Sequence, residues 1–163
     1  MGGYDFVNLW DLRNLNKKTT VLAHYQIIKP LKINHLAVFT IIVIAQIIPA
    51  LWYGLFTDSW MKLNNFTMDF ITENQSSTPY IASVIGSLII TYPMAHLFTK
   101  MNITTGVQGL LTGALIGLAF THVPNIVTSQ FEFRPYALSW INGGVNIIIY
   151  AIAGFILGAW KKY

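Results

Sequence analysis

Four long apolar stretches separated by short polar segments make up most of this 163-residue sequence. They cover about residues 33–56, 79–98, 106–130 and 135–160, and none of them contains Asp, Glu, Lys or Arg. A helix rises about 1.5 Å per residue, so about 20 apolar residues are needed to cross a hydrocarbon core about 30 Å thick. The pattern therefore predicts an all-α polytopic membrane protein with four transmembrane helices.

The composition agrees with this fold class. Hydrophobic residues make up 54% of the chain, charged residues only 10%, and the mean hydropathy is +0.53. A soluble domain carries roughly a quarter charged residues, which excludes an ordinary soluble protein. The net charge of +4 does not indicate nucleic-acid binding, because the basic residues lie at the ends of apolar stretches. The chain has no Cys, which excludes disulfides, thiol catalysis and thiolate metal sites.

The positions of Lys and Arg predict the orientation. If the four stretches alternate in direction, eight of the ten basic residues fall on one side: Arg13, Lys17, Lys18, Lys29, Lys32, Lys100, Lys161 and Lys162. Only Lys62 and Arg134 fall on the other side. Basic residues near span ends stay in the cytoplasm, so we expect both termini to be cytoplasmic.

Two segments lie outside the predicted spans. Residues 1–32 are expected to form a cytoplasmic or interfacial N-terminal extension, followed by the transmembrane domain over residues 33–163. Apolar positions recur in the extension at helical spacing, as at Leu9, Leu12 and Leu15, so a helix on the membrane surface and a plain tail are both open. Residues 57–78 are the one sizeable loop, on the outer side, and we expect Asp58 to cap a short surface helix there.

Glycines recur every four residues on the third span, at Gly109, Gly113 and Gly117, and again at Gly154 and Gly158 on the fourth. Glycines four apart share one helix face and let a second backbone approach closely. They indicate either packing within the bundle or a seam between copies. Packing is the favoured interpretation, because every four-helix bundle needs such faces.

Polar residues at membrane depth are the candidate functional residues. Gln46, His122, Asn125, Asn142 and Asn146 all fall in the outer half of the bilayer at similar height, counting 1.5 Å per residue along each span. This coincidence predicts a small polar cavity open to the outer side. Ordinary hydrogen bonding between helices is the alternative, and we favour it because no charged group concentrates a site.

No motif for catalysis or cofactor binding is present. The sequence contains no Gly-x-Ser-x-Gly elbow, no His-Glu-x-x-His and no P-loop or dinucleotide fingerprint. His96 is predicted near the inner end of its span and His122 far towards the outside, so the two are too far apart in depth to share a metal or haem. We expect no enzymatic activity, no cofactor and no metal.

Several short motifs resemble a bacterial family of small four-helix membrane proteins, domain-of-unknown-function family 1761. The resemblance covers about residues 34–160, and it rests on Asn34, Leu51-Trp52-Tyr53-Gly54-Leu55-Phe56, Trp60-Met61, Phe131-Glu132-Phe133-Arg134-Pro135 and Gly154-Phe155-Ile156-Leu157-Gly158-Ala159-Trp160. Where the family pattern Asn-x-Gly-x-His ends in histidine, this chain has Asn146. The resemblance implies the fold and a bacterial inner-membrane location, and it implies no activity.

Two functions are consistent with these features. One is a small non-enzymatic transporter- or channel-like homo-oligomer that uses the predicted polar cavity. The alternative is an accessory or scaffolding subunit of a larger membrane complex that uses the glycine faces. In both cases the partners are the lipid bilayer and another membrane chain, either a second copy or a different subunit, and nucleic acid is not among them.

Overall fold

The computed structural model describes residue 17 and residues 31–163, so nearly all of the predicted extension over residues 1–32 lies outside the described residues. The helices are α2 (His35–Asn64), α3 (Met68–Glu73), α4 (Thr78–Lys100), α5 (Gly106–Gly117), the π-helix η1 (Leu118–His122), α6 (Val123–Phe131) and α7 (Tyr136–Ala159). Within the described part, four helical stretches are long and apolar enough to cross a membrane: α2, α4, α7 and the continuous run from Gly106 to Phe131. The predicted all-α fold with four transmembrane helices is confirmed.

The first helix is longer than the predicted span. It continues to Asn64, so Asp58 lies inside α2 and does not cap a separate helix, contrary to the expectation. Nothing between residues 56 and 64 breaks a helix, and α2 stops at Asn65, which adopts the left-handed conformation with φ of 56°. The short surface helix does exist, but it is α3, and its cap is Thr67, whose side chain accepts a hydrogen bond from the Phe70 N–H.

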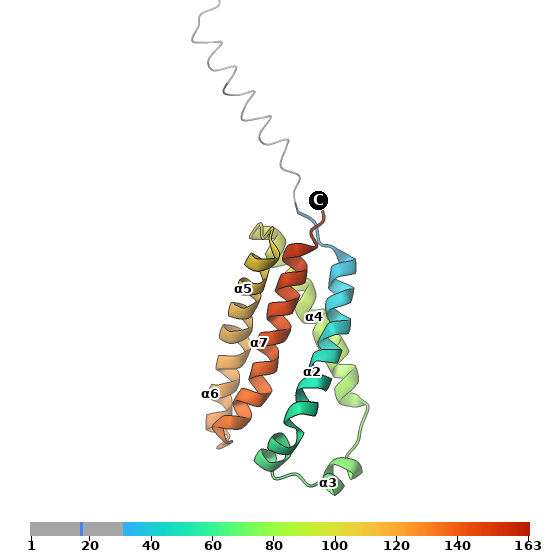
Figure 1. The fold of residues 1–163 in the computed structure, drawn as a ribbon, viewed down its shortest axis with the longest axis vertical. Coiled ribbons are helices and arrows are strands. Elements are labelled where there is room, and N and C mark those ends of the chain that lie inside the picture. Colours follow the sequence, from blue (N-terminus) through green and yellow to red (C-terminus); the bar gives the residue numbers. More distant parts are fainter. Residues whose placement is uncertain (1–16, 18–30) are drawn as a thin grey trace, which may run out of the picture. The chain divides into compact units, whose positions relative to one another are not determined.

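Helix α7 lies at the centre of the arrangement. It contacts α5, η1 and α6 on one side and α2 on another, while α4 packs mainly on α2. Figure 1 shows that α7 runs antiparallel to α2 and to the α5–α6 run. Because connections of a few residues join consecutive helices, this up-and-down order is the expected topology of a helical bundle.

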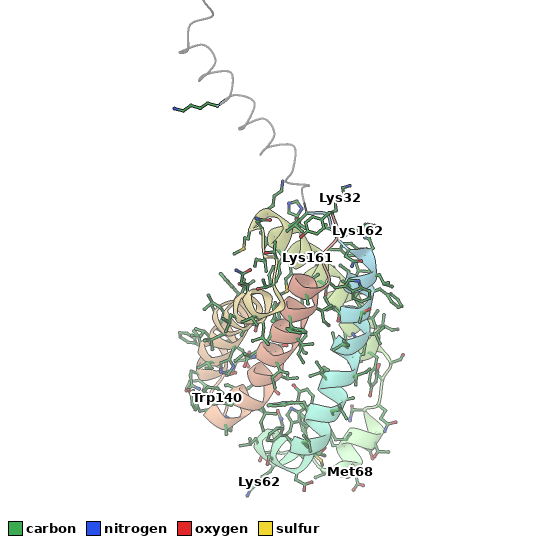
Figure 2. All side chains as sticks on the ribbon, turned by 45° about the horizontal axis from the view of Figure 1, so that its top comes forward. Lys32, Lys62, Met68, Trp140, Lys161 and Lys162 are labelled. Carbon is green, nitrogen blue, oxygen red and sulfur yellow. The ribbon has the colours of Figure 1, made fainter. Side chains whose placement is uncertain are left out.

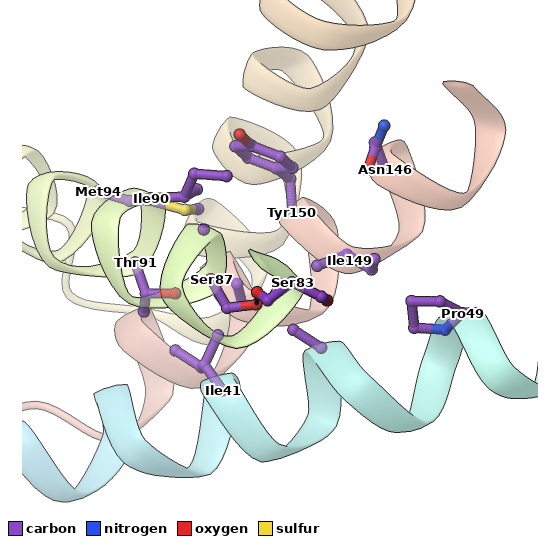
Figure 3. Close-up of a pocket in the computed structure, with 13 residues that line it drawn as sticks. Ile41, Pro49, Ser83, Ser87, Ile90, Thr91, Met94, Asn146, Ile149 and Tyr150 are labelled. Carbon is purple, nitrogen blue, oxygen red and sulfur yellow. Dashed lines mark hydrogen bonds between the residues drawn. The ribbon is translucent and has the colours of Figure 1, made fainter. Parts of the chain in front are cut away.

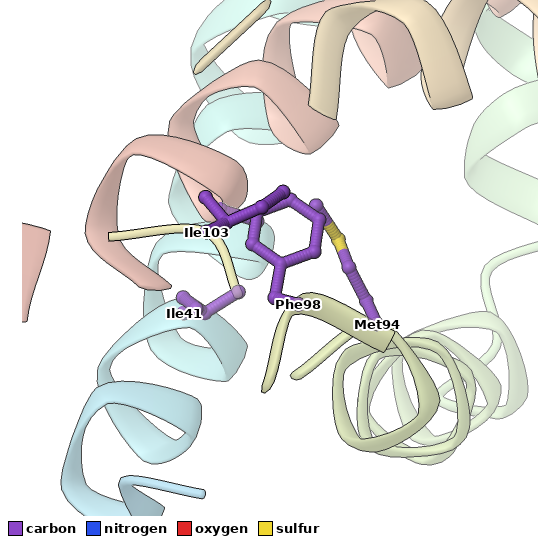
Figure 4. Close-up of a cluster of buried hydrophobic side chains, with 5 residues drawn as sticks. Ile41, Met94, Phe98 and Ile103 are labelled. Atoms are coloured by element: carbon purple, nitrogen blue, oxygen red, sulfur yellow. The ribbon is translucent and has the colours of Figure 1, made fainter. Parts of the chain in front are cut away.

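The buried apolar core lies at the end of the bundle where α2 begins. Ile41, Met94, Phe98, Ile103 and Ala153 form one cluster there, contributed by α2, α4, α7 and the α4–α5 connection (Figure 4). The two halves of α4 differ in burial. Its buried residues all lie between Thr91 and Phe98, whereas residues 78–85 are exposed. In a membrane such exposed apolar positions face lipid or a partner.

The glycines of α5 and α7 pack directly on each other. A Cβ atom added to Gly109 would collide with the backbone oxygen of Gly154, and one added to Gly113 would collide with that of Tyr150. On Gly117 it would lie 2.9 Å from the Cα of Ile147. The two glycine faces are therefore filled by each other within one chain, as the packing interpretation expected, and they are not open to a second copy.

The two ends of the bundle differ in charge. Within residues 31–163, Lys32, Lys100, Lys161 and Lys162 lie at one end without an acidic residue beside them in that range, and Lys62, Arg134, Asp58, Asp69, Glu73 and Glu132 lie at the other (Figures 1 and 2). Glu132 and Arg134 form an ion pair of 2.7 Å across the α6–α7 turn, with both side chains half exposed. Such a pair contributes little stability, which fits a connector between helices.

The charge difference generates a test of orientation. We expect alkaline phosphatase fused after Tyr163 to be inactive in bacterial cells and the same enzyme inserted after Asn74 to be active, because lysine-rich span ends stay in the cytoplasm. Colony colour and alkaline phosphatase activity measure the outcome. Activities in the reverse order would place the lysine-rich end outside.

The glycine packing generates a second test. Gly113→Ala should lower the stability of the protein in detergent by about 1–3 kcal/mol, because the new methyl group collides with backbone atoms of α7 that cannot rotate away. Gly86→Ala is the matched control, since nothing lies within 4 Å of its added Cβ, and it should be neutral or slightly stabilising. Thermal unfolding measures both, and equal effects of the two substitutions would contradict the packing described here.

Candidate functional site

A cavity of about 240 Å³ lies between α2, α4 and α7 (Figure 3). Its lining is mostly apolar, with a few hydroxyl and amide groups: Ile41, Ala45, Pro49, Ser83, Gly86, Ser87, Ile90, Thr91, Met94, Asn146, Ile149, Tyr150 and Ala153. No Asp, Glu, Lys, Arg or His lines it. An apolar cavity with a small number of polar groups is the usual form of a site for a small molecule.

Local sequence features keep this space open. Gly86 of α4 has no neighbouring atom within 4 Å of where a Cβ would lie, so α4 does not pack closely at this level. Pro49 lies inside α2 and has no N–H, so the carbonyl of Ala45 lacks its helical donor. Ala45 and Pro49 both line the cavity, and this carbonyl adds a backbone acceptor beside it.

Gln46 connects α2 to α4 at the cavity. Ser83 Oγ donates to Gln46 Oε1 at 2.8 Å, and Gln46 Nε2 donates to Ser87 Oγ at 3.0 Å. Ser87 Oγ in turn donates to the backbone oxygen of Ser83 at 2.7 Å. Each such bond between membrane helices contributes on the order of 1 kcal/mol or less, so together they hold the two helices in register at this depth.

Two asparagines of α7 form a second polar group. The Tyr53 hydroxyl donates to Asn142 Oδ1 at 3.2 Å, which joins α2 to α7. Asn146 Nδ2 donates to the backbone oxygen of Asn142 at 3.3 Å, and Asn146 lines the cavity whereas Asn142 does not. Next to them the Trp52 Nε1–H donates to the Ile141 oxygen at 2.9 Å, with its ring 3.4 Å from where a Cβ of Gly144 would lie.

His122 and Asn125 lie elsewhere, where η1 and α6 pack on α7. The His122 side chain is 1% exposed, and its ring centroid lies 4.4 Å from that of Trp140. A Cβ on Gly143 would collide with the imidazole, so this glycine makes room for the ring. Asn125 Oδ1 is also buried. Neither residue lines the cavity.

The five predicted site residues are therefore divided among three places. Asn146 lines the cavity and Gln46 bonds to two of its serines, Asn142 lies at the α2–α7 contact, and His122 and Asn125 lie apart. The sequence reasoning missed the hydroxyl groups of Ser83, Ser87, Thr91 and Tyr150. The sequence does indicate Ser83, Ser87 and Thr91 as a group, because their spacing of four residues places them on one face of the second span.

The remaining histidines do not form a metal site within the described residues, where no group of three or more His, Asp or Glu side chains comes together. His35 Nδ1 lies 3.1 Å from the Tyr92 hydroxyl, and their rings are 5.8 Å apart. His96 is exposed near the end of α4. These contacts belong to the lysine-rich end of the bundle, away from the cavity.

The four apolar helices define the class of the molecule, a multi-pass α-helical membrane protein. A comparison with protein families is more specific. The family described as "Protein of unknown function (DUF1761)" matches residues 36–158, so the chain belongs to this family. No curated protein and no solved structure gives a significant match.

Proposed function

We propose that this protein is a non-enzymatic transporter- or channel-like protein of the bacterial inner membrane that takes up a small uncharged molecule in the cavity between α2, α4 and α7. The cavity supports this function best, because it combines hydroxyl and amide groups with an apolar wall in the middle of the membrane domain. Polar groups at membrane depth are expensive and mark solute pathways in many membrane proteins.

The lining selects an uncharged solute. Moving an ion into hydrocarbon without a partner charge is strongly unfavourable, and the lining offers no acidic or basic side chain. Ser83, Ser87 and Gln46 already satisfy one another, which leaves Thr91, Asn146 and Tyr150 to bond to a solute. A small molecule with one or two hydroxyl or amide groups and an otherwise apolar carbon skeleton matches these hydrogen-bonding groups.

The exposed first half of α4 provides the route by which a solute would enter the cavity. Residues 78–85 are exposed on every side, and Gly86 leaves open space beside the cavity. The cavity therefore lies directly behind the surface that this helix offers to lipid or to a second copy. A homo-oligomer that packs along α4 would enclose the path, which supports the proposed oligomeric channel or carrier.

The cavity can be tested by filling its entrance. In proteoliposomes we expect glycerol, an uncharged probe, to enter faster than in protein-free vesicles, and we expect Gly86→Leu to lower this excess rate by roughly tenfold because a leucine side chain occupies the cavity mouth. Stopped-flow light scattering measures the rate. Gly54→Leu is the matched control, because Gly54 also has open space and does not line the cavity.

Two results would count against the proposal. Glycerol entry at the rate of empty vesicles, with correctly folded protein, would argue against a pathway for such solutes. Equal rates for the wild-type protein and Gly86→Leu would show that any pathway runs outside this cavity.

An accessory subunit of a larger membrane complex is the second candidate. The observation that favours it is again the exposed first half of α4, since this face could equally be covered by a different chain. The glycine faces that suggested this role are already filled by α5 and α7. A partner subunit would therefore have to use α4.

Native mass spectrometry of the protein, released gently from its membrane, separates the two candidates. We expect a homo-oligomer, because a second copy would cover α4 and close the cavity. Substitution of Ala82 by Trp on the exposed face of α4 should weaken that oligomer, whereas Val107→Trp, on an exposed face of α5, should not. A different polypeptide at fixed stoichiometry would support the accessory role.

A further inference from the structure

Three side chains where η1 and α6 pack on α7 bury polar atoms without a partner. Both imidazole nitrogens of His122, Asn125 Oδ1 and Ser139 Oγ are inaccessible and have no hydrogen-bond partner in the protein, and they are the complete set of such side-chain atoms among the described residues. His122 is 1% and Ser139 0% exposed. One unpaired buried polar group costs about 1–3 kcal/mol, so four of them require a partner.

Helical spacing brings these side chains together. Asn125 follows His122 by three residues and therefore shares its face. On the facing helix, Ser139 lies one turn before Gly143, the residue on which the His122 imidazole packs. Spacing therefore places the three polar side chains within about one helical turn of one another on two adjacent helices, with the Trp140 ring against the His122 imidazole.

The backbone of this segment departs from a regular α-helix. The π-helix η1 ends at His122, and the Val123 N–H bonds five residues back to the Leu118 oxygen. Pro124 follows and has no N–H, so a carbonyl of the preceding turn also lacks its helical donor. Single π turns inside membrane or soluble helices are frequent at functional sites.

We propose that His122, Asn125 and Ser139 form an internal site for water, separate from the cavity. Neutral imidazole offers one N–H and one lone pair, the asparagine oxygen accepts, and the serine hydroxyl does both, so the ligand must donate and accept. No Asp, Glu, Lys or Arg occurs in η1, α6 or α7 to balance a buried ion, so the ligand is neutral.

Size points to the same ligand. The nitrogens of His122 and the oxygens of Asn125 and Ser139 are closed to the surface, so a molecule that bonds to them must be small, and water is the smallest that both donates and accepts hydrogen bonds. Buried waters typically make about three hydrogen bonds to polar groups that the protein leaves unpaired. This site supplies that number of partners within two adjacent helices.

The experiment is water-edited NMR of ¹⁵N-histidine-labelled protein in lipid nanodiscs. Although its side chain is buried, His122 should receive magnetisation from water, and Ser139→Ala should lower this transfer roughly twofold because one group that holds the water is lost. Ser129→Ala is the matched control, a buried serine of α6 outside this set, and it should leave the transfer unchanged.

The His122 signals are assigned by their loss in His122→Phe or, if that variant does not fold, by elimination with His24→Gln, His35→Gln and His96→Gln. Absence of water transfer to His122 in the folded wild-type protein would overturn the proposal. So would a metal ion that co-purifies with the protein and is lost with the His122 side chain, because the ligand would then be the metal.

Discussion

The direct backbone contact between α5 and α7 is the interaction on which the rest of the structure depends. Lipid offers no hydrophobic force to push helices together, so the pair is held by close packing, and only glycine at positions such as 109, 113 and 154 permits it. With α5 fixed there, the other faces of α7 are free to receive α2 and to line the cavity. The close α5–α7 contact thus leaves α7 able to line the cavity on its other side.

The two halves of the membrane domain are built on different principles. Between α5 and α7, the glycines bring the two backbones into direct contact. On the α2–α4 side, the helices are joined by the Gln46 hydrogen bonds and by the buried cluster around Phe98, and space remains between them. Hydrogen bonds fix register without demanding close approach, which is why a cavity persists beside them.

The sequence predicts the spans well because a long apolar segment without charges is stable in a bilayer only as a helix, which satisfies its own backbone hydrogen bonds. It predicts the end of α2 poorly, since the preference of Asp58 for a cap is too small to end a helix by itself, and α2 stops only where Asn65 adopts the left-handed conformation. The candidate site was predicted from depth alone, and depth does not fix rotation about the helix axis. The π-helix that ends at His122 changes which residues after it share a face with those before it, and no residue spacing revealed this.

The first and last residues of the transmembrane domain are hydrogen-bonded to each other. The Lys32 N–H donates to the Lys162 oxygen at 2.8 Å, and Asn34 Nδ2 donates to the Trp160 oxygen at 3.0 Å. The path of the chain through the four spans is therefore almost a closed ring, and the order in which the gene encodes them is not dictated by the fold. A circular permutant that joins these ends and opens the Glu132–Arg134 turn would keep every contact between helices.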